Sequence, residues 1–163
     1  MDDLDRKILG VLARDGRVTV AELGRRVNLS PPAVGERVRR LEQSGVITGY
    51  RAQLDLRLLG YPLIAIVRVK PAPGRLATVA GLAQEIPEVV ECHRITGEDC
   101  FFLKVALRSI DELGTLLDRF LDYGETTTSI VNASPVPPRD PPLDPYGVRW
   151  TSTSTGRGRR SSA

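Results

Sequence analysis

The chain has 163 residues and a net charge of +3, and 41% of its residues are hydrophobic and 26% charged, as is typical of globular proteins. No run approaches the ~18 consecutive apolar residues that a membrane-spanning helix requires. The acidic start MDDLDRK precedes no continuous apolar segment, which argues against a secretory signal. We therefore expect a cytoplasmic protein that does not bind membranes.

Cysteine and histidine content argues against a metal site. Cys92 and Cys100 do not have the C-x-x-C spacing, and His93 is the only histidine. A zinc site would therefore lack ligands. We predict no metal and no cofactor, and two ordinary reduced thiols.

The charge is distributed unevenly along the chain. Residues 1–53 carry ten Arg and Lys against seven Asp and Glu, residues 54–133 eight against eleven, and residues 134–163 five against two. A basic N-terminal part followed by an acidic central part favours binding of a polyanion by the former. A solvated charged surface would give the same counts.

Apolar residues at helical spacing predict two short helices at the start of the chain. The first follows an aspartate cap, Asp2 or Asp3, and ends near residue 12. The second begins at Thr19, which has capping-box spacing to Glu22. Asn28 follows the last apolar residue of this helix and suits a left-handed turn position.

The third helix has the clearest start signal. Ser30 is a good N-cap, and Pro31 fits the first helical position because no amide donor is needed there. The apolar stripe of this helix ends before Ser44 and Gly45. Charged residues lie between its apolar positions.

Three short helices with a tight turn between the last two predict a helix-turn-helix, whose final helix enters the major groove of DNA. Arginine suits this position because it binds both guanine edges and phosphates. The alternative is a solvated helical bundle, which explains any single arginine as well but the whole arrangement less well. The predicted DNA-binding residues are Arg25, Arg26, Ser30, Pro32, Glu36, Arg37, Arg39 and Arg40.

Alternating strand and helix patterns follow. A linker strand is expected at 47–54, then strands at 63–69, 89–96, 100–107 and 126–133, with helices at 75–85 and 110–121. The order βαββαβ indicates a ferredoxin-like α+β fold. Both helices of that fold cover one face of the sheet, yet the strand at 63–69 is apolar on both faces. Association into a homodimer through the other face resolves this conflict.

The sequence divides into four parts. These are a helix-turn-helix domain at 1–46, a linker strand and hinge at 47–61, the βαββαβ domain at 62–133, and a Pro-, Ser- and Arg-rich tail at 134–163. The tail cannot bury a core, so it is expected to be disordered.

Motifs in both halves resemble those of the Lrp/AsnC (leucine-responsive, feast/famine) transcriptional regulators. In the first half these are LD-x-x-I-L, LS-x-x-x-V-x-x-R-V-x-x-L and GVI-x-GY-x-A-x-LD. In the second half ECHRITGEDCFFLKVALRSIDEL and YGETTTSIV resemble the ligand-binding RAM domain. The resemblance implies a winged-type helix-turn-helix followed by a RAM domain. It also implies a sequence-specific regulator that is not an enzyme.

The resemblance further implies three partners: double-stranded DNA, a small effector that is usually an amino acid, and further copies of the chain, as dimers that build tetramers or octamers. In the family, effectors bind between subunits near a G-x-x-D-type turn. Here that implies Gly97 and Glu98 framing the pocket and Asp99 pairing with the amino group. Hydroxyl groups would come from Thr96, Thr126 and Thr128.

Two departures from the family pattern leave the effector open. Asp99 comes two residues after Gly97 instead of three, with Cys100 at the usual place of the acid, and Tyr-Gly-Glu replaces the commoner Pro-Gly-Val before the last strand. A hairpin turn alone also favours Gly and Asp. The alternatives are therefore an architectural DNA-binding protein without an effector, or a small enzyme on a ferredoxin-like dimer. The enzyme lacks any catalytic constellation in the sequence.

Overall fold

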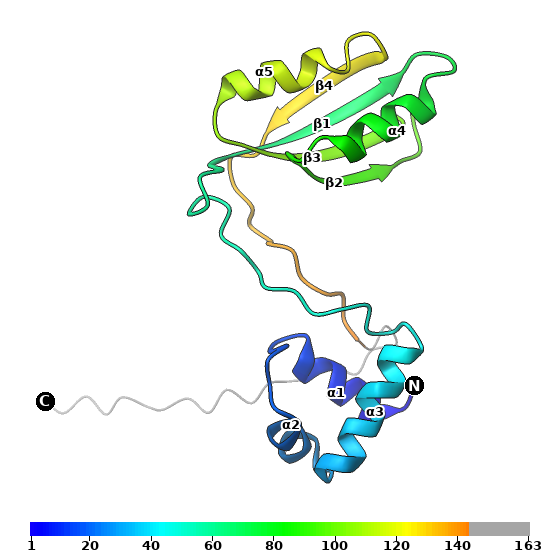
Figure 1. The fold of residues 1–163 in the computed structure, drawn as a ribbon, viewed down its shortest axis with the longest axis vertical. Coiled ribbons are helices and arrows are strands. Elements are labelled where there is room, and N and C mark those ends of the chain that lie inside the picture. Colours follow the sequence, from blue (N-terminus) through cyan, green and yellow to red (C-terminus); the bar gives the residue numbers. More distant parts are fainter. Residues whose placement is uncertain (144–163) are drawn as a thin grey trace, which may run out of the picture. The chain divides into compact units, whose positions relative to one another are not determined.

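The computed structural model describes residues 1–143, which form two compact units (Figure 1). The helical unit comprises residues 1–51 together with residues 138–143, and the sheet unit comprises residues 52–137. Residues 144–163, which belong to the predicted disordered tail, lie outside the described part.

The helical unit contains the three predicted helices, α1 (Asp3–Leu12), α2 (Val20–Val27) and α3 (Pro31–Gln43). Each helix contributes to one small core. The residues that are 5% exposed or less are Ile8 of α1, Leu23 and Val27 of α2, and Val34 and Leu41 of α3. The apolar stripes expected from the sequence are therefore the buried ones.

The turn between α2 and α3 is fixed by backbone geometry. Asn28 ends α2 in the left-handed conformation (φ 59°, ψ 48°), as the sequence predicts. The amide of Leu29 donates to the carbonyl of Gly24 (2.9 Å). A Cβ atom at Gly24 would come within 2.7 Å of the carbonyl oxygen of Leu29, so the absence of a side chain lets the chain turn tightly into α3.

The linker strand predicted at 47–54 is not formed, and neither is a wing after α3. Residues 48–55 have no regular structure and residues 56–60 form a turn. The turn is closed by a hydrogen bond from the amide of Tyr61 to the carbonyl of Leu56 (2.8 Å). A strand requires a hydrogen-bonded neighbour, and no strand of the described chain pairs with these residues. The alternating pattern was therefore an insufficient signal.

The sheet unit has the predicted βαββαβ order. Its elements are β1 (Leu63–Pro71), α4 (Leu76–Glu85), β2 (Val89–Arg94), β3 (Phe101–Leu107), α5 (Ile110–Asp118) and β4 (Gly124–Ile130). The strands are antiparallel in the order β2-β3-β1-β4. Figure 1 shows α4 and α5 on the same side of this sheet.

The core of this unit lies between the sheet and its two helices. Val67 of β1, Leu103 of β3, Val79 of α4 and Leu116 of α5 are at most 4% exposed. Side chains alternate along each strand, so the residues between these buried positions lie on the opposite side. We call that side the open face. It carries Ile64, Ile66 and Arg68 of β1, Glu91 and His93 of β2, Phe102, Lys104 and Ala106 of β3, and Thr127 and Ser129 of β4.

The open face is partly covered by the chain itself. Leu56 and Tyr61, which precede β1, line a hollow of about 190 Å³ with Val90 and Ala106. Ala106 is consequently only 3% exposed, whereas Ile64 and Ile66 remain half-buried. The predicted second apolar face therefore exists, and part of it still meets solvent in the single chain.

Candidate functional site

The exposed side of α3 carries the residues best placed to meet a ligand. Pro32, Glu36, Arg39 and Gln43 recur at intervals of three or four residues, so they share one helical face, and all are exposed. Arg40 flanks this stripe and is exposed as well. Ser30 acts as the N-cap, its Oγ accepting from the amide of Ala33 (3.4 Å). It therefore holds the start of the helix.

The charges of the stripe are partly neutralised within it. Glu36 and Arg39 form an ion pair across one helical turn. Their side chains are 56% and 62% exposed, and exposed pairs of this kind contribute only about 0–1 kcal/mol. Both side chains can therefore exchange their partner for a ligand at low cost.

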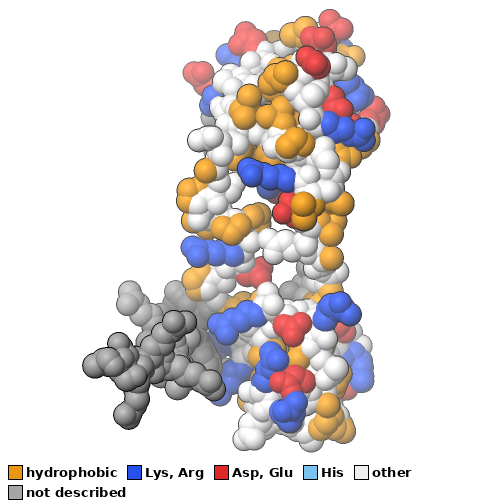
Figure 2. All heavy atoms as spheres, turned by 90° about the vertical axis from the view of Figure 1, so that its left-hand side faces the viewer, with side chains coloured by type: hydrophobic (Ala, Val, Ile, Leu, Met, Phe, Trp, Pro, Cys, Tyr) orange, Lys and Arg blue, Asp and Glu red, His pale blue; other side chains and the backbone are white. Residues whose placement is uncertain are grey.

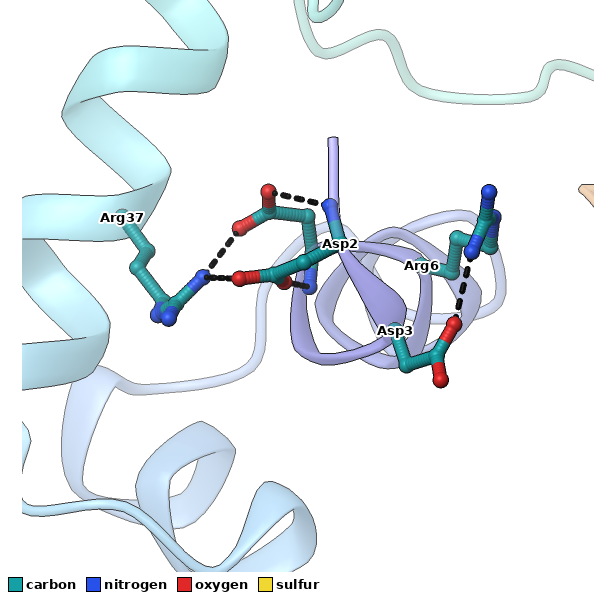
Figure 3. Close-up of polar contacts among 5 residues, drawn as sticks. Asp2, Asp3, Arg6 and Arg37 are labelled. Carbon is teal, nitrogen blue, oxygen red and sulfur yellow. Dashed lines mark hydrogen bonds and ion pairs between the residues drawn. The ribbon is translucent and has the colours of Figure 1, made fainter.

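Arg37 lies differently from the other predicted DNA-binding arginines. Its Nη1 donates to Oδ2 of Asp2 and to Oδ1 of Asp5, both at 2.7 Å. Figure 3 shows the side chain reaching from α3 to the start of α1. Arg37 is only 22% exposed. The structure thus places it between two helices, where it fixes the position of α3 against α1, and not on the exposed stripe.

Asp2 and Asp5 form the capping box of α1 as well as binding Arg37. Oδ1 of Asp2 accepts from the amide of Asp5 (2.8 Å), and Oδ2 of Asp5 accepts from the amide of Asp2 (3.0 Å). The sequence indicated Asp2 or Asp3 as the cap, but not the connection of Asp2 to Arg37. Two features of the sequence could have indicated this connection. Asp2 and Asp5 are one helical turn apart, and Arg37 lies beside the apolar stripe of α3.

The second helix presents two arginines at its C-terminal end. Arg25 and Arg26 both pair with Glu22, Arg26 at 2.7 Å. Their side chains are 79% and 45% exposed. On the face of the helical unit seen in Figure 2, Lys and Arg side chains likewise lie next to Asp and Glu side chains. The surface of this unit is therefore a mixed one, with exposed arginines at the end of α2 and along α3.

The Asp2 carboxyl is the one strongly shifted titratable group of this unit. The backbone hydrogen bond from Asp5 and then the Arg37 side chain lower the pKa of Asp2 from 3.8 to about 2. Because the unfolded chain binds this proton more readily, the stabilisation is complete above the unfolded pKa and is lost as the pH falls from about 4 to about 2.

We expect Asp2→Asn to melt at a lower temperature than the unaltered protein at pH 6, with the difference shrinking as the pH falls from about 4 to about 2 and Asp2 becomes protonated. Asparagine keeps an oxygen that can cap the helix but loses the charged oxygen that accepts from Arg37. Circular dichroism melts from pH 6 to 2 measure this. Asp3→Asn is the control, since Asp3 pairs with Arg6 and not with Arg37. A difference that is independent of pH would contradict the assignment.

Four of the predicted effector residues, Thr96, Gly97, Glu98 and Asp99, lie in the hairpin between β2 and β3. The amide of Ile95 donates to the carbonyl of Cys100 (2.9 Å) and closes the loop. Gly97 has a φ of +112°, a conformation that side chains disfavour. Thr96 and Glu98 are exposed. Nη1 of Arg68 lies 3.0 Å from Oδ2 of Asp99, so the acid of this loop is bound to the open face.

Thr126 and Thr128 are not brought together with Asp99. They pair with Val69 and Val67, whose side chains are buried under the helices. Thr127 pairs with Arg68 and therefore lies on the same face as Asp99. Thr127 and Arg68 were not among the residues predicted from the sequence. Arg68 stands between the buried Val67 and Val69. Because side chains alternate along a strand, this position already indicates that Arg68 lies on the opposite face.

Among residues 1–143, neither of the two thiols has a partner that would activate it. Cys92 is exposed and Cys100 half-buried, and both are free. Although the residue as a whole is exposed, partial desolvation of its thiol raises the pKa of Cys92, which favours the unreactive thiol. Residues 1–143 contain no group of three or more His, Cys, Asp or Glu side chains that could hold a metal ion. No helix in this range is long and apolar enough to cross a membrane.

Comparison with known proteins identifies both units. Residues 1–42 match the AsnC-type helix-turn-helix domain, and residues 64–141 match the Lrp/AsnC ligand binding domain. The HTH-type transcriptional regulator YezC of Bacillus subtilis is 40% identical over 134 residues, which cover 82% of this chain and 95% of that protein. The chain belongs to the Lrp/AsnC family of transcriptional regulators.

Solved structures agree. LrpC of Bacillus subtilis has a TM-score of 0.79 and 32% identity, covering 82% of this chain and 96% of that one. The regulator NMB0573 of Neisseria meningitidis, solved in complex with L-Met, has a TM-score of 0.79 and 30% identity over 85% of this chain and 94% of that one. The protein is thus a DNA-binding regulator with a ligand-binding domain, and its named relatives are regulators, not enzymes.

Proposed function

We propose that this regulator binds specific sequences of double-stranded DNA in the cytoplasm by placing α3 in the major groove. The observation that carries the proposal is the exposed stripe of α3, which starts at a capped N-terminus behind a tight helix-turn-helix turn. The N-terminal part of the last helix meets base edges in this motif.

The exposed residues divide into two roles. Arg39 and Arg40 are suited to guanine edges and phosphates, and Glu36 to the amino group of cytosine. Arg25 and Arg26 are suited to the phosphates beside the groove. Arg37 has a third role, since its contacts with Asp2 and Asp5 orient α3 and leave little of it exposed.

We further propose that two copies associate through the open face. Ile64, Ile66 and Phe102 are half-buried there, and no helix of residues 1–143 covers them. Packing them against a second copy removes this apolar surface from water. A symmetric dimer presents two reading helices to two half-sites. Assembly of dimers into tetramers or octamers is part of the same proposal.

The effector we propose is an amino acid bound between subunits at the hairpin of Thr96, Gly97, Glu98 and Asp99. Two comparisons support this class: a relative in Haemophilus influenzae is named leucine-responsive regulatory protein, and NMB0573 was solved with L-Met. The second candidate is an architectural DNA-binding protein without an effector. The pairing of Asp99 with Arg68 favours it, because the acid is already neutralised.

Selection from a random double-stranded DNA library at moderate salt tests the DNA-binding proposal. We expect a pair of related half-sites, with centres separated by a multiple of about 10 base pairs. Recovery of fragments that share no sequence would contradict specific recognition and support the architectural role.

Melting of the full chain with each of the twenty L-amino acids tests the effector, since a ligand that binds the folded state raises the melting temperature. Stabilisation by none of them would contradict an amino-acid effector.

A further inference from the structure

We propose that residues 145–163, which we call the basic segment, bind the phosphates of the DNA beside the site of α3 and form a second, sequence-independent DNA-binding element. The inference rests on DNA binding by the helical unit and adds a contact that lies outside both matched domains, since the match to the ligand-binding domain ends at residue 141. The residues that carry the contact are Arg149, Arg157, Arg159 and Arg160.

The composition of the basic segment suits a polyanion. It contains four arginines and no Asp or Glu, and three of the arginines lie within residues 157–160. Residues 151–163 have no apolar side chain larger than that of alanine, so they offer nothing for apolar packing against another protein. Clustered arginines of this kind are typical of contacts with nucleic acid.

The described part of the chain brings the start of the basic segment to the DNA-binding unit. Residues 138–143 group with residues 1–51 and not with the sheet unit that precedes them in the chain. Leu143 is half-buried, and a Cβ atom at Gly10 of α1 would lie 3.6 Å from its Cδ1 atom. Leu143 therefore packs on α1, and the basic segment begins on the surface of the unit that carries α3.

The basic segment is long enough to reach DNA from this point. Arg157 follows Leu143 by 14 residues, which span at most about 46–50 Å when fully extended. A unit of about 50 residues has a radius of gyration of only about 10 Å. Because the arginines are tethered to a unit that is itself bound to DNA, their effective concentration at the phosphates is high, and weak contacts are enough to add affinity.

The helical unit gains from further cations because acids offset many of its own. Residues 1–51 carry ten Arg and Lys against seven Asp and Glu, whereas residues 138–163 carry five against two and so double the net charge of this unit. Glu22 pairs with two arginines of α2, and Glu36 pairs with Arg39. Within the basic segment no acid offsets the arginines. Each phosphate contact that they make releases bound counterions and strengthens binding.

The acidic sheet unit is the competing partner for these arginines. Residues 52–137 carry eight Arg and Lys against eleven Asp and Glu. Arginines attracted to this unit would be withdrawn from DNA, and their removal would then strengthen DNA binding. The two partners predict changes of opposite sign, so DNA affinity distinguishes them.

Binding titrations of the full chain across a salt series test the proposal. Arg157→Gln, Arg159→Gln and Arg160→Gln are combined in one variant, and the matched control has Lys at the same three positions, which keeps the charge that phosphates bind. We expect the Gln variant to bind about tenfold more weakly per copy at low salt, and its slope of log affinity against log salt to fall by about two to three per bound copy. The loss should be equal for a selected site and for random-sequence duplex, because phosphate contacts carry no sequence information. The Lys variant should bind like the unaltered protein.

A further variant tests the contact with α1. Leu143→Ser keeps all the arginines but removes the apolar contact at Gly10. We expect DNA binding to weaken by about threefold with an unchanged salt slope, because the arginines remain but are held near the DNA less often. Unaltered affinity would overturn the role of Leu143 as the anchor.

The other outcomes are equally decisive. Unchanged binding of the Gln variant overturns the proposal, and stronger binding overturns it in favour of the sheet unit as the partner. Equal losses in the Gln and Lys variants also overturn it, since charge would not be their cause. If selection yields no specific site, the proposed recognition by α3 falls, while the contribution of the arginines is still measured on random-sequence duplex.

Discussion

Gly124→Ala is expected to destabilise the sheet unit by about 3 kcal/mol, because a Cβ atom there overlaps backbone that cannot move away. At the start of β4 this glycine pairs with Pro71 at the end of β1. Its Cβ would overlap the carbonyl oxygen of Lys70 and lie 2.8 Å from Cα of Pro71. Both atoms belong to the end of β1 that pairs with β4, so these two strands must separate there.

Thermal unfolding of the sheet unit measures this effect, with a fall in melting temperature on the order of 15 °C for a unit of this size. Gly114→Ala is the control. Gly114 lies exposed in α5, with no atom within 4 Å of the Cβ position. Alanine there should stabilise the helix by about 0.5–1 kcal/mol. Equal melting temperatures for the two variants would show that β4 yields at Gly124 and would contradict the close approach.

Local signals predicted the helical unit because its elements are determined by their own residues. The caps Asp2, Thr19 and Ser30 each accept the expected backbone hydrogen bond, and Asn28 adopts the left-handed conformation. These interactions extend over three or four residues, so they can be recognised from spacing alone. The order of strands and helices in the sheet unit could be predicted from the sequence for the same reason.

What the sequence did not reveal depends on contacts between distant residues. Arg37 lies beside the apolar stripe of α3, but its position in the sequence does not reveal that α1 holds it, whereas Arg40 is exposed. Thr126 and Thr128 could be separated from Thr127 only once β4 was registered against β1. The pattern at 47–54 resembles a strand, but the described chain supplies no strand to pair with it.

Arg40→Ala is expected to weaken DNA binding without changing the melting temperature. Arg40 is exposed beside the stripe of α3, and loss of one phosphate contact lowers affinity on the order of fivefold per bound copy at physiological salt. The slope of log affinity against log salt should fall by about one for each copy on the DNA. Binding titrations across a salt series measure both quantities.

Arg37→Ala should lower the melting temperature and leave the salt slope of DNA binding unchanged, which is the reverse of the result expected for Arg40→Ala. Loss of Arg37 leaves Asp2 and Asp5 without their cation, so the helical unit should melt several degrees lower. DNA affinity should also fall, because α3 loses its hold on α1, but the salt slope should stay as it was, since no phosphate contact is removed. Arg39→Ala, which removes an exposed arginine from the same helix, serves as the control for stability and should melt like the unaltered protein. If Arg37→Ala lowered the salt slope and left the melting temperature unchanged, Arg37 would belong to the DNA-binding surface, and its contact with α1 would give way when DNA binds.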